Sequence, residues 1–134
     1  MMREILFRGK FGNEWKYGFL SIEPKGLVIK EPYKNESSNV WHIDADTIGQ
    51  YTGLKDENGT KIFEGDILEA DVFKNLNRCK AIWTVEYKER FSQGNGYYFY
   101  GKNRRFNARA TQSTIINTHA TVIGNIYDNP ELLK

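Results

Sequence analysis

The chain has 134 residues, with 19 Lys and Arg against 17 Asp and Glu, and a formal net charge of +2. Hydrophobic residues make up 40% and aromatic residues 14%, with one Cys and three Pro. The length fits one domain or two very small ones sharing a core. The composition argues against a disordered chain, a collagen-like chain and a disulfide-stapled scaffold.

The start of the chain, residues 1–8, lacks the apolar run of a signal peptide. No apolar stretch approaches the roughly 20 residues that cross a bilayer, so no membrane association is expected. Cys79 is the single cysteine and cannot form an intramolecular disulfide, which favours a reducing, cytoplasmic setting. One Cys with His42 and His119 cannot supply zinc ligands at finger-like spacing. We therefore expect no metal and no cofactor.

Short runs rich in β-branched and aromatic residues predict strands over most of the first half of the chain. These expected strands are 4–8, 15–22, 26–30 and 40–43, followed by an extended segment 48–54. The polar, Ser- and Asn-rich residues 31–39 predict an exposed loop. Asp44 or Asp46 could cap a single helical turn before Thr47.

The residues Asp-Glu-Asn-Gly at 56–59 are a strong hairpin signal. They predict a type I′ turn, in which Asn58 and Gly59 both take positive φ. A strand 61–64 should follow, and Gly65 should break it before the next strand.

The second half of the chain continues in the same way, and its clearest strand, 80–88, alternates apolar and polar residues. Further strands are expected at 67–73, 96–100 and 121–127. The segment 71–79 comes nearest to a helical period, but a connecting loop or a single turn fits it equally well. Asn129 followed by Pro130 predicts one terminal helical turn.

Many short strands with frequent turns predict a mainly β protein, either all-β or α+β with little helix. A small bent β-barrel is expected in the C-terminal half, and an SH3-like barrel is one form it could take. The chain is expected to be a single compact domain, 1–134. A break near 51–56 could divide it into parts 1–50 and 51–134.

The segment 50–68 reads QYTGLKDENGTKIFEGDIL and strongly resembles the signature block of the YopX family, which consists of small phage and prophage proteins. REILFR at 3–8 and VIGNIYDNPELL at 122–133 resemble the opening and closing blocks of that family. The resemblance spans the chain, with a variable middle. It implies a phage-encoded, soluble, largely β protein that acts in the cytoplasm of a bacterial host. It implies no reaction and no catalytic residue.

The residues of this block have a structural interpretation. Glycines suit positive φ or close approach, Gly65 suits a bulge or corner, and Asp66 can accept hydrogen bonds from nearby backbone N–H groups. The alternative is a contact with a peptide, a nucleotide or a protein at the turn Thr52–Gly53. The residues interpreted as structural are Gln50, Tyr51, Gly53, Asn58, Gly59, Gly65 and Asp66.

Candidate catalytic groups are isolated from one another. Glu64 and Asp66 could share one face of a strand, but a bend at Gly65 would separate them. His42, His119 and Cys79 have no partner motif. We therefore expect no enzyme and no catalytic residue.

The charge distribution is the most informative functional signal. Residues 80–110 hold seven basic and two acidic side chains, a local net charge of +5, whereas residues 1–79 carry −2. Rings and cations interleaved in this way can stack bases and neutralise phosphates. A solvated loop beside core aromatics is the structural alternative, and an acidic protein surface is a further one. The candidate binding residues are Tyr97, Tyr98, Lys102, Arg104, Arg105 and Arg109.

These patterns favour a non-enzymatic binding or regulatory module that contacts a phage or host macromolecule. The alternative is a nucleic-acid-binding accessory protein that uses the basic and aromatic segment 97–109. Self-association is a further option, because exposed strand edges and surplus aromatic residues favour it.

Overall fold

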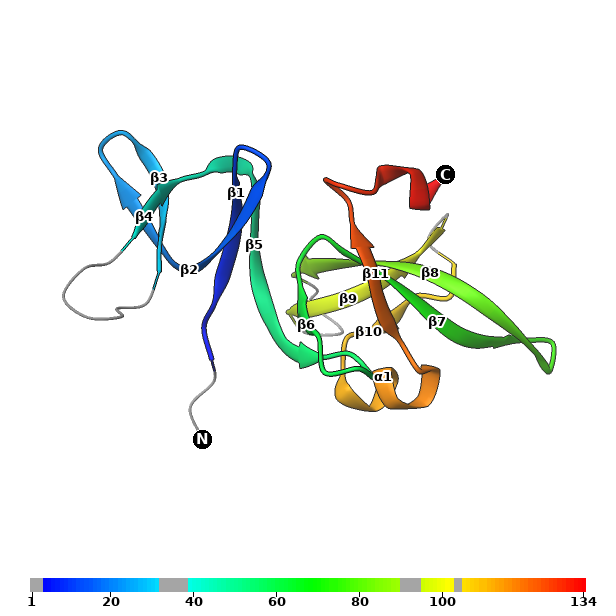
Figure 1. Cartoon of the computed structure of the whole chain (residues 1–134). Helices are drawn as coiled ribbons and strands as arrows, with labels where there is room; N and C mark the ends of the chain where they lie inside the picture. The colour runs from blue at the N-terminus through cyan, green and yellow to red at the C-terminus, as the bar shows by residue number, and fades with distance from the viewer. Residues whose placement is uncertain (1–3, 32–38, 90–94, 103–104) are drawn as a thin grey trace. The chain divides into compact units, whose positions relative to one another are not determined.

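The computed structural model describes residues 4–31, 39–89, 95–102 and 105–134 (Figure 1). The chain forms two compact units, Met1–Gly53 and Leu54–Lys134. Strands account for 62% and helices for 10% of the described residues. The prediction of a mainly β protein is therefore confirmed.

The first unit is an antiparallel meander that ends in a long strand. Its neighbouring strands follow the order β4-β3-β2-β1-β5, and β6 comes next to β5. The expected strands 15–22, 26–30 and 40–43 are confirmed, while the first strand begins later than expected. The strands of this unit are β1 (Phe7–Phe11), β2 (Glu14–Glu23), β3 (Gly26–Lys30), β4 (Val40–His42) and β5 (Asp44–Lys55), whose last two residues belong to the second unit. β6 (Lys61–Phe63) lies within the second unit. Most of the loop expected at 31–39 lies outside the described residues.

The helical turn expected before Thr47 is wrong, because β5 already begins at Asp44. The Thr47 hydroxyl donates to the Asp44 carbonyl at 2.7 Å and accepts from the Lys10 backbone N–H at 2.8 Å. Lys10 also lies opposite Asp44 in the pairing of β1 with β5. The pairing shifts register between Arg8 and Lys10, and these contacts tie the irregular segment of β5 to β1.

The second unit is built on an antiparallel sheet with the strand order β10-β9-β8-β7-β11. The strands and the 3₁₀ turn expected here are confirmed, whereas α1 was not expected. Thr111 caps α1 by accepting from the Thr114 N–H. The elements are β7 (Asp66–Lys74), β8 (Asn77–Lys88), β9 (Gly96–Gly101), β10 (Ala108–Arg109), α1 (Gln112–Thr118), β11 (Thr121–Asn125) and the 3₁₀ helix η2 (Pro130–Leu133).

This sheet is open, whereas a small barrel was expected. Its edge strands, β10 and β11, do not pair with each other in the described part of the chain. β10 is only two residues long, and the pairing of β11 with β7 shifts register between Val122 and Gly124. Such short and irregular edges leave too few backbone groups in register to close a barrel.

The segment 71–79 is neither a loop nor a helical turn. β7 extends to Lys74 and β8 starts at Asn77, so the two strands form one long hairpin with Asn75 and Leu76 as its turn. The sequence signal was weak because the turn contains no glycine.

The core of the second unit lies on one face of this sheet. Trp83 and Phe99 are almost fully buried there, and their rings stack at 5.0 Å between centroids. The Trp83 indole N–H donates to the Phe106 carbonyl at 2.9 Å, which satisfies its polar edge. Ile115 of α1 is 1% exposed and joins the same cluster. A seven-residue helix is too short to be stable alone, so this contact is what holds α1 in place.

Two adjacent isoleucines of α1 test this account. Ile115→Ala should lower the free energy of unfolding by about 2–5 kcal/mol, because it leaves a cavity in the core. Ile116 is 63% exposed, so Ile116→Ala should change it by no more than about 0.5 kcal/mol. Urea unfolding followed by Trp fluorescence measures both. Equal losses in the two variants would contradict the assigned core face of α1.

Candidate functional site

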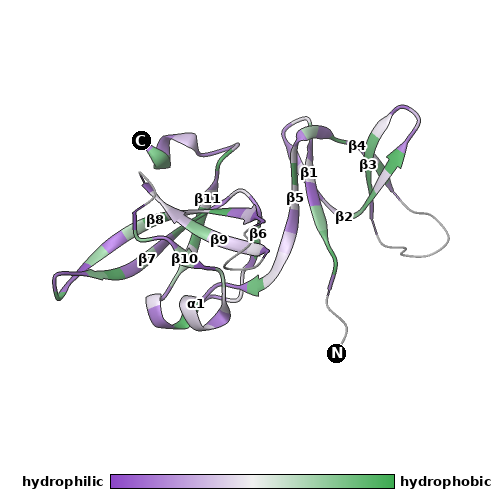
Figure 2. Cartoon of the chain, turned by 180° about the vertical axis from the view of Figure 1, so that it is seen from behind, coloured by the Kyte–Doolittle hydropathy of each residue, from purple (hydrophilic) through white to green (hydrophobic). Residues whose placement is uncertain are grey.

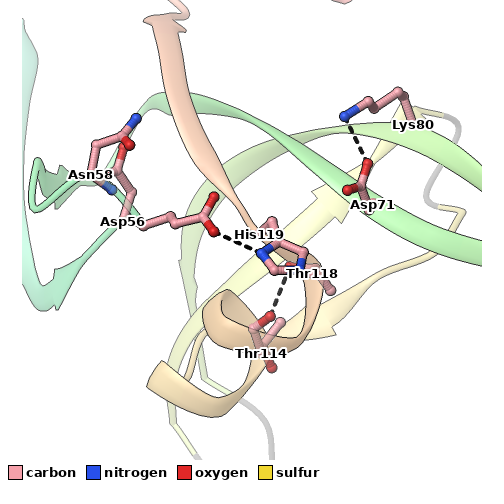
Figure 3. Close-up of polar contacts among 8 residues, drawn as sticks. Asp56, Asn58, Asp71, Lys80, Thr114, Thr118 and His119 are labelled. Carbon is pink, nitrogen blue, oxygen red and sulfur yellow. Dashed lines mark hydrogen bonds and ion pairs between the residues drawn. The ribbon is translucent and has the colours of Figure 1, made fainter.

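The turn of the 50–68 block is held by one buried carboxylate. Asp56 is 5% exposed, and its Oδ1 accepts from the backbone N–H groups of Asn58 and Thr60, each at 2.9 Å. Its Oδ2 accepts from the Val122 N–H of β11, also at 2.9 Å. Figure 3 shows Asp56 beside Asn58 at this turn. One side chain therefore fixes the turn and joins it to a strand 66 residues away in sequence.

The type I′ turn predicted at Asn58 and Gly59 is wrong. Gly59 has φ 84°, but Asn58 is not among the described residues with positive φ. The Gly59 N–H instead donates to the Asp56 carbonyl at 3.0 Å, and the Asp56 N–H donates to the Thr60 carbonyl at 2.8 Å. The Asp56 carboxylate binds the Asn58 N–H directly, and this bond decides the turn geometry over the local preference of Asn-Gly.

The corner at Gly65 and Asp66 is also made of backbone contacts. Gly65 has φ 86°, its N–H donates to the Val85 carbonyl at 3.0 Å, and its carbonyl accepts from the Ile126 N–H at 2.9 Å. A Cβ on Gly65 would lie 3.2 Å from the Tyr127 ring. Asp66 is 2% exposed and accepts from the Phe63 N–H at 2.8 Å. These contacts support the structural interpretation of both residues.

The first part of the block belongs to the first unit. Gln50 lies opposite Phe7 in the pairing of β5 with β1. Tyr51 is 4% exposed, and its N–H donates to the Leu6 carbonyl at 2.8 Å. Gly53 follows with φ 87°. Thr52 is buried as well, so only the Gly53 side of the proposed Thr52–Gly53 contact is open to solvent.

Figure 3 shows two polar side-chain pairs on the surface of the second unit. His119 Nδ1 is 2.7 Å from Glu57 Oε1, and both side chains are about half exposed. Lys80 Nζ is 2.7 Å from Asp71 Oδ1. The hydrogen bond from Lys80 lowers the pKa of Asp71 and, reciprocally, raises the pKa of Lys80. Both pairs join residues that the sequence separates, so no local pattern could have indicated them.

The structure separates the two tyrosines proposed to stack bases. Tyr97 is half-buried and packs against the core cluster, whereas Tyr98 points to the opposite face of the sheet and is 6% exposed. Tyr98 therefore offers no free ring for stacking. Two rings of this region are exposed, Tyr87 by 45% and Phe106 by 40%. The centroid of Tyr87 lies 5.4 Å from that of Tyr97 in an edge-to-face arrangement.

The cations of the segment remain on the surface. Arg109 lies over Tyr98 with its Cζ 5.7 Å from the ring centroid, and Lys88 Nζ lies 6.0 Å from the centroid of Tyr100. Lys102 and Arg105 are exposed just beyond β9. Arg104 lies outside the described residues. We refer to Lys88, Lys102, Arg105 and Arg109 as the cationic surface.

Other kinds of site receive no support from the described residues. They contain no group of three or more His, Cys, Asp or Glu that could hold a metal ion. Within the same ranges, no helix is long and apolar enough to cross a membrane.

A family model described as YopX protein matches residues 8–134. The chain belongs to the YopX family. This match confirms the resemblance of the 50–68 block. Among solved structures, this YopX-family chain is similar to protein EF1440 from Enterococcus faecalis, with 26% identity and a TM-score of 0.57. That likeness covers 99% of this chain and 100% of the other. No curated protein matches.

The role of Asp56 can be tested against its neighbour. Asp56→Ala should lower the free energy of unfolding of the YopX-family protein by about 2–4 kcal/mol, because three backbone N–H groups lose a charged acceptor. Glu57→Ala removes only the exposed pair with His119 and should cost no more than about 1 kcal/mol. Chemical denaturation compares the two. If Asp56→Ala proved as mild as Glu57→Ala, the carboxylate would not be the anchor of the turn.

The pair of Asp71 and Lys80 predicts a dependence on acid. Its contribution to stability is present above the unfolded pKa of Asp71, about 3.9, and is lost as pH falls through the lower folded pKa. Lys80→Met should move the carboxyl pKa of Asp71 back up towards its usual range. NMR titration of the Asp71 carboxyl carbon measures this, and an unchanged pKa in the variant would contradict the assigned cause.

Proposed function

We propose that this YopX-family protein is a non-enzymatic binding module that contacts an anionic macromolecule of the phage or host through the cationic surface. The observation that carries the proposal is the placement of Arg109 over Tyr98 and of Lys88 over Tyr100 on one face of the second sheet. The centroids of the two tyrosine rings are 6.2 Å apart, so both cations lie over the same pair of neighbouring, buried rings.

A cation held over a buried ring is suited to binding. The ring face attracts the charge and limits the positions it samples, so less side-chain entropy is lost when a partner binds. The fork of N–H donors on Arg109 can then reach a carboxylate or a phosphate in a bidentate manner. Lys88 Nζ lies 3.4 Å from Glu86 Oε1, so part of the Lys88 charge is neutralised within the protein.

The buried carboxylates of the 50–68 block make hydrogen bonds within the fold. Asp56 and Asp66 are both buried, and both accept backbone hydrogen bonds within the fold. A general acid or base has to exchange protons with a substrate that it touches. Buried carboxylates that bind the backbone instead support a binding role over a catalytic one.

Nucleic acid is the second candidate partner, and one observation favours it. Tyr87 presents an exposed ring at the end of β8, on the face of the sheet opposite to Lys88. An exposed ring can stack a base of a single strand while cations at the same end of the sheet meet its phosphates. Membership of the YopX family supports the further proposal that the protein is phage-encoded and acts in the cytoplasm of its bacterial host.

Charge reversal at matched sites tests the cationic surface. Arg105→Glu/Arg109→Glu and the control Lys25→Glu/Lys134→Glu both change the formal net charge from +2 to −2, and all four residues are exposed. Fluorescence anisotropy with a labelled 20-nucleotide single strand, over a salt series, measures binding of nucleic acid. Pull-down from nuclease-treated host lysate measures binding of an acidic protein.

Binding in either assay should be lost in the first variant and kept in the control. In the nucleic-acid case, the slope of log affinity against log salt should fall by about 1–2. Equal behaviour of the two variants in both assays would contradict the proposal. Absence of binding to the single strand at low salt would eliminate the nucleic-acid candidate.

A further inference from the structure

The end of the β7–β8 hairpin presents an apolar tip to solvent. All residues from Phe73 to Arg78 are exposed, with Phe73 66% and Leu76 97% exposed. Figure 1 shows this ribbon extending beyond the other strands of its sheet, and Figure 2 shows that apolar and polar segments both reach its end. The tip therefore makes no contribution to the core of its unit.

The backbone conformation at the turn of the tip is unfavourable for Leu76. Lys74 pairs with Asn77, which leaves a two-residue turn in which Asn75 has φ 51° and Leu76 has φ 69°. This is a type I′ turn, which strongly prefers glycine at its second central position. A leucine there strains the backbone and gains nothing from packing. The presence of a leucine at position 76 is therefore not explained by a contribution to folding stability.

Hydrogen-bond donors and cations surround this leucine. Lys74, Asn75, Asn77 and Arg78 flank it, and the sequence has no acidic residue from 72 to 79. In the described part of the chain, neither Lys74 nor Arg78 makes an ion pair, whereas the next cation along β8, Lys80, is already paired with Asp71. Arg78 lies beside Phe73 with its Cζ 6.0 Å from the ring centroid. The tip thus combines an apolar point with positive charge, of which that of Arg78 also interacts with Asp71.

We propose that the hairpin tip, Phe73–Arg78, is a contact site for duplex DNA. Lys74 and Arg78 meet phosphates on either side, and Leu76 enters a base step as a wedge, as apolar side chains do in proteins that bind the minor groove. Asn75 and Asn77 can donate to acceptors on the base edges. The tip carries two cations and no acidic residue, so its charge favours a polyanion such as DNA.

The dimensions of the hairpin allow this contact. Beyond the last buried pair, Ala70 and Ala81, four further residue pairs extend the ribbon. At about 3.3 Å per residue they add about 13 Å, which is enough to carry the tip past the phosphate backbone. The site is separate from the cationic surface, because Asn77 and Lys88 are the two ends of β8.

Leu76→Gly is the decisive variant. Glycine adopts positive φ without strain, so the variant should keep or raise the melting temperature, and any loss of binding cannot come from misfolding. The affinity of the full-length Leu76→Gly variant for a labelled 20-base-pair duplex should be about tenfold lower than that of the unchanged protein. A duplex containing 2-aminopurine should gain fluorescence with the unchanged protein, because the wedge unstacks a base, and should not gain it with Leu76→Gly.

Two further variants complete the test. Ile22→Ala removes a different exposed apolar side chain, 85% exposed, and should bind the duplex as the unchanged protein does. Lys74→Glu/Arg78→Glu should reduce the salt slope by about 1–2. The proposal is overturned if Leu76→Gly keeps full affinity, if Ile22→Ala loses as much, or if 2-aminopurine fluorescence does not rise. Loss of a protein partner by Leu76→Gly with DNA binding intact would also overturn it, in favour of a protein groove.

Discussion

The carboxylate of Asp56 accepts hydrogen bonds from three backbone N–H groups, two in its own turn and one in β11. Much of the second unit depends on this arrangement. The bond to Val122 fixes one edge of the sheet, and the next residues of the turn reach the end of α1, where the Glu57 N–H donates to the Ala120 carbonyl. The Gly65 corner then directs the chain into β7. Residues 56–65 of the 50–68 block thus join parts of the second unit that are far apart in sequence.

This explains why the family block and the candidate binding surfaces lie in different places. A residue whose polar groups are used within the fold has little left to offer a partner, and Asp56 and Asp66 are of this kind. The two proposed sites lie near the two ends of β8, one around Arg109 and the other at the hairpin tip. Both proposed sites lie between residues 73 and 109, outside the 50–68 block.

The strands could be predicted because alternation and β-branched residues are local signals, as in 80–88. The turns could not be predicted: the Asp56 carboxylate overrode the Asn-Gly preference through its bond to the Asn58 N–H, and the I′ turn fell on Asn75 and Leu76, which include no glycine. Counting charges located the basic segment. It could not show that Tyr98 is buried while Tyr87 is exposed, because the faces of neighbouring strands depend on register and on what covers the sheet.

The span of the Asp56 contacts also bears on the order in which the protein forms during synthesis. The first unit closes within residues 1–53, so its contacts are complete once that length has left the ribosome. The bond from Val122 to Asp56 spans 66 residues and waits for almost the whole chain. Until β11 has been synthesised, the apolar faces of β7, β8 and β9 lack the edge strand that pairs with β7. The protein therefore depends most on protection from other molecules in the cell while its second unit is still being synthesised.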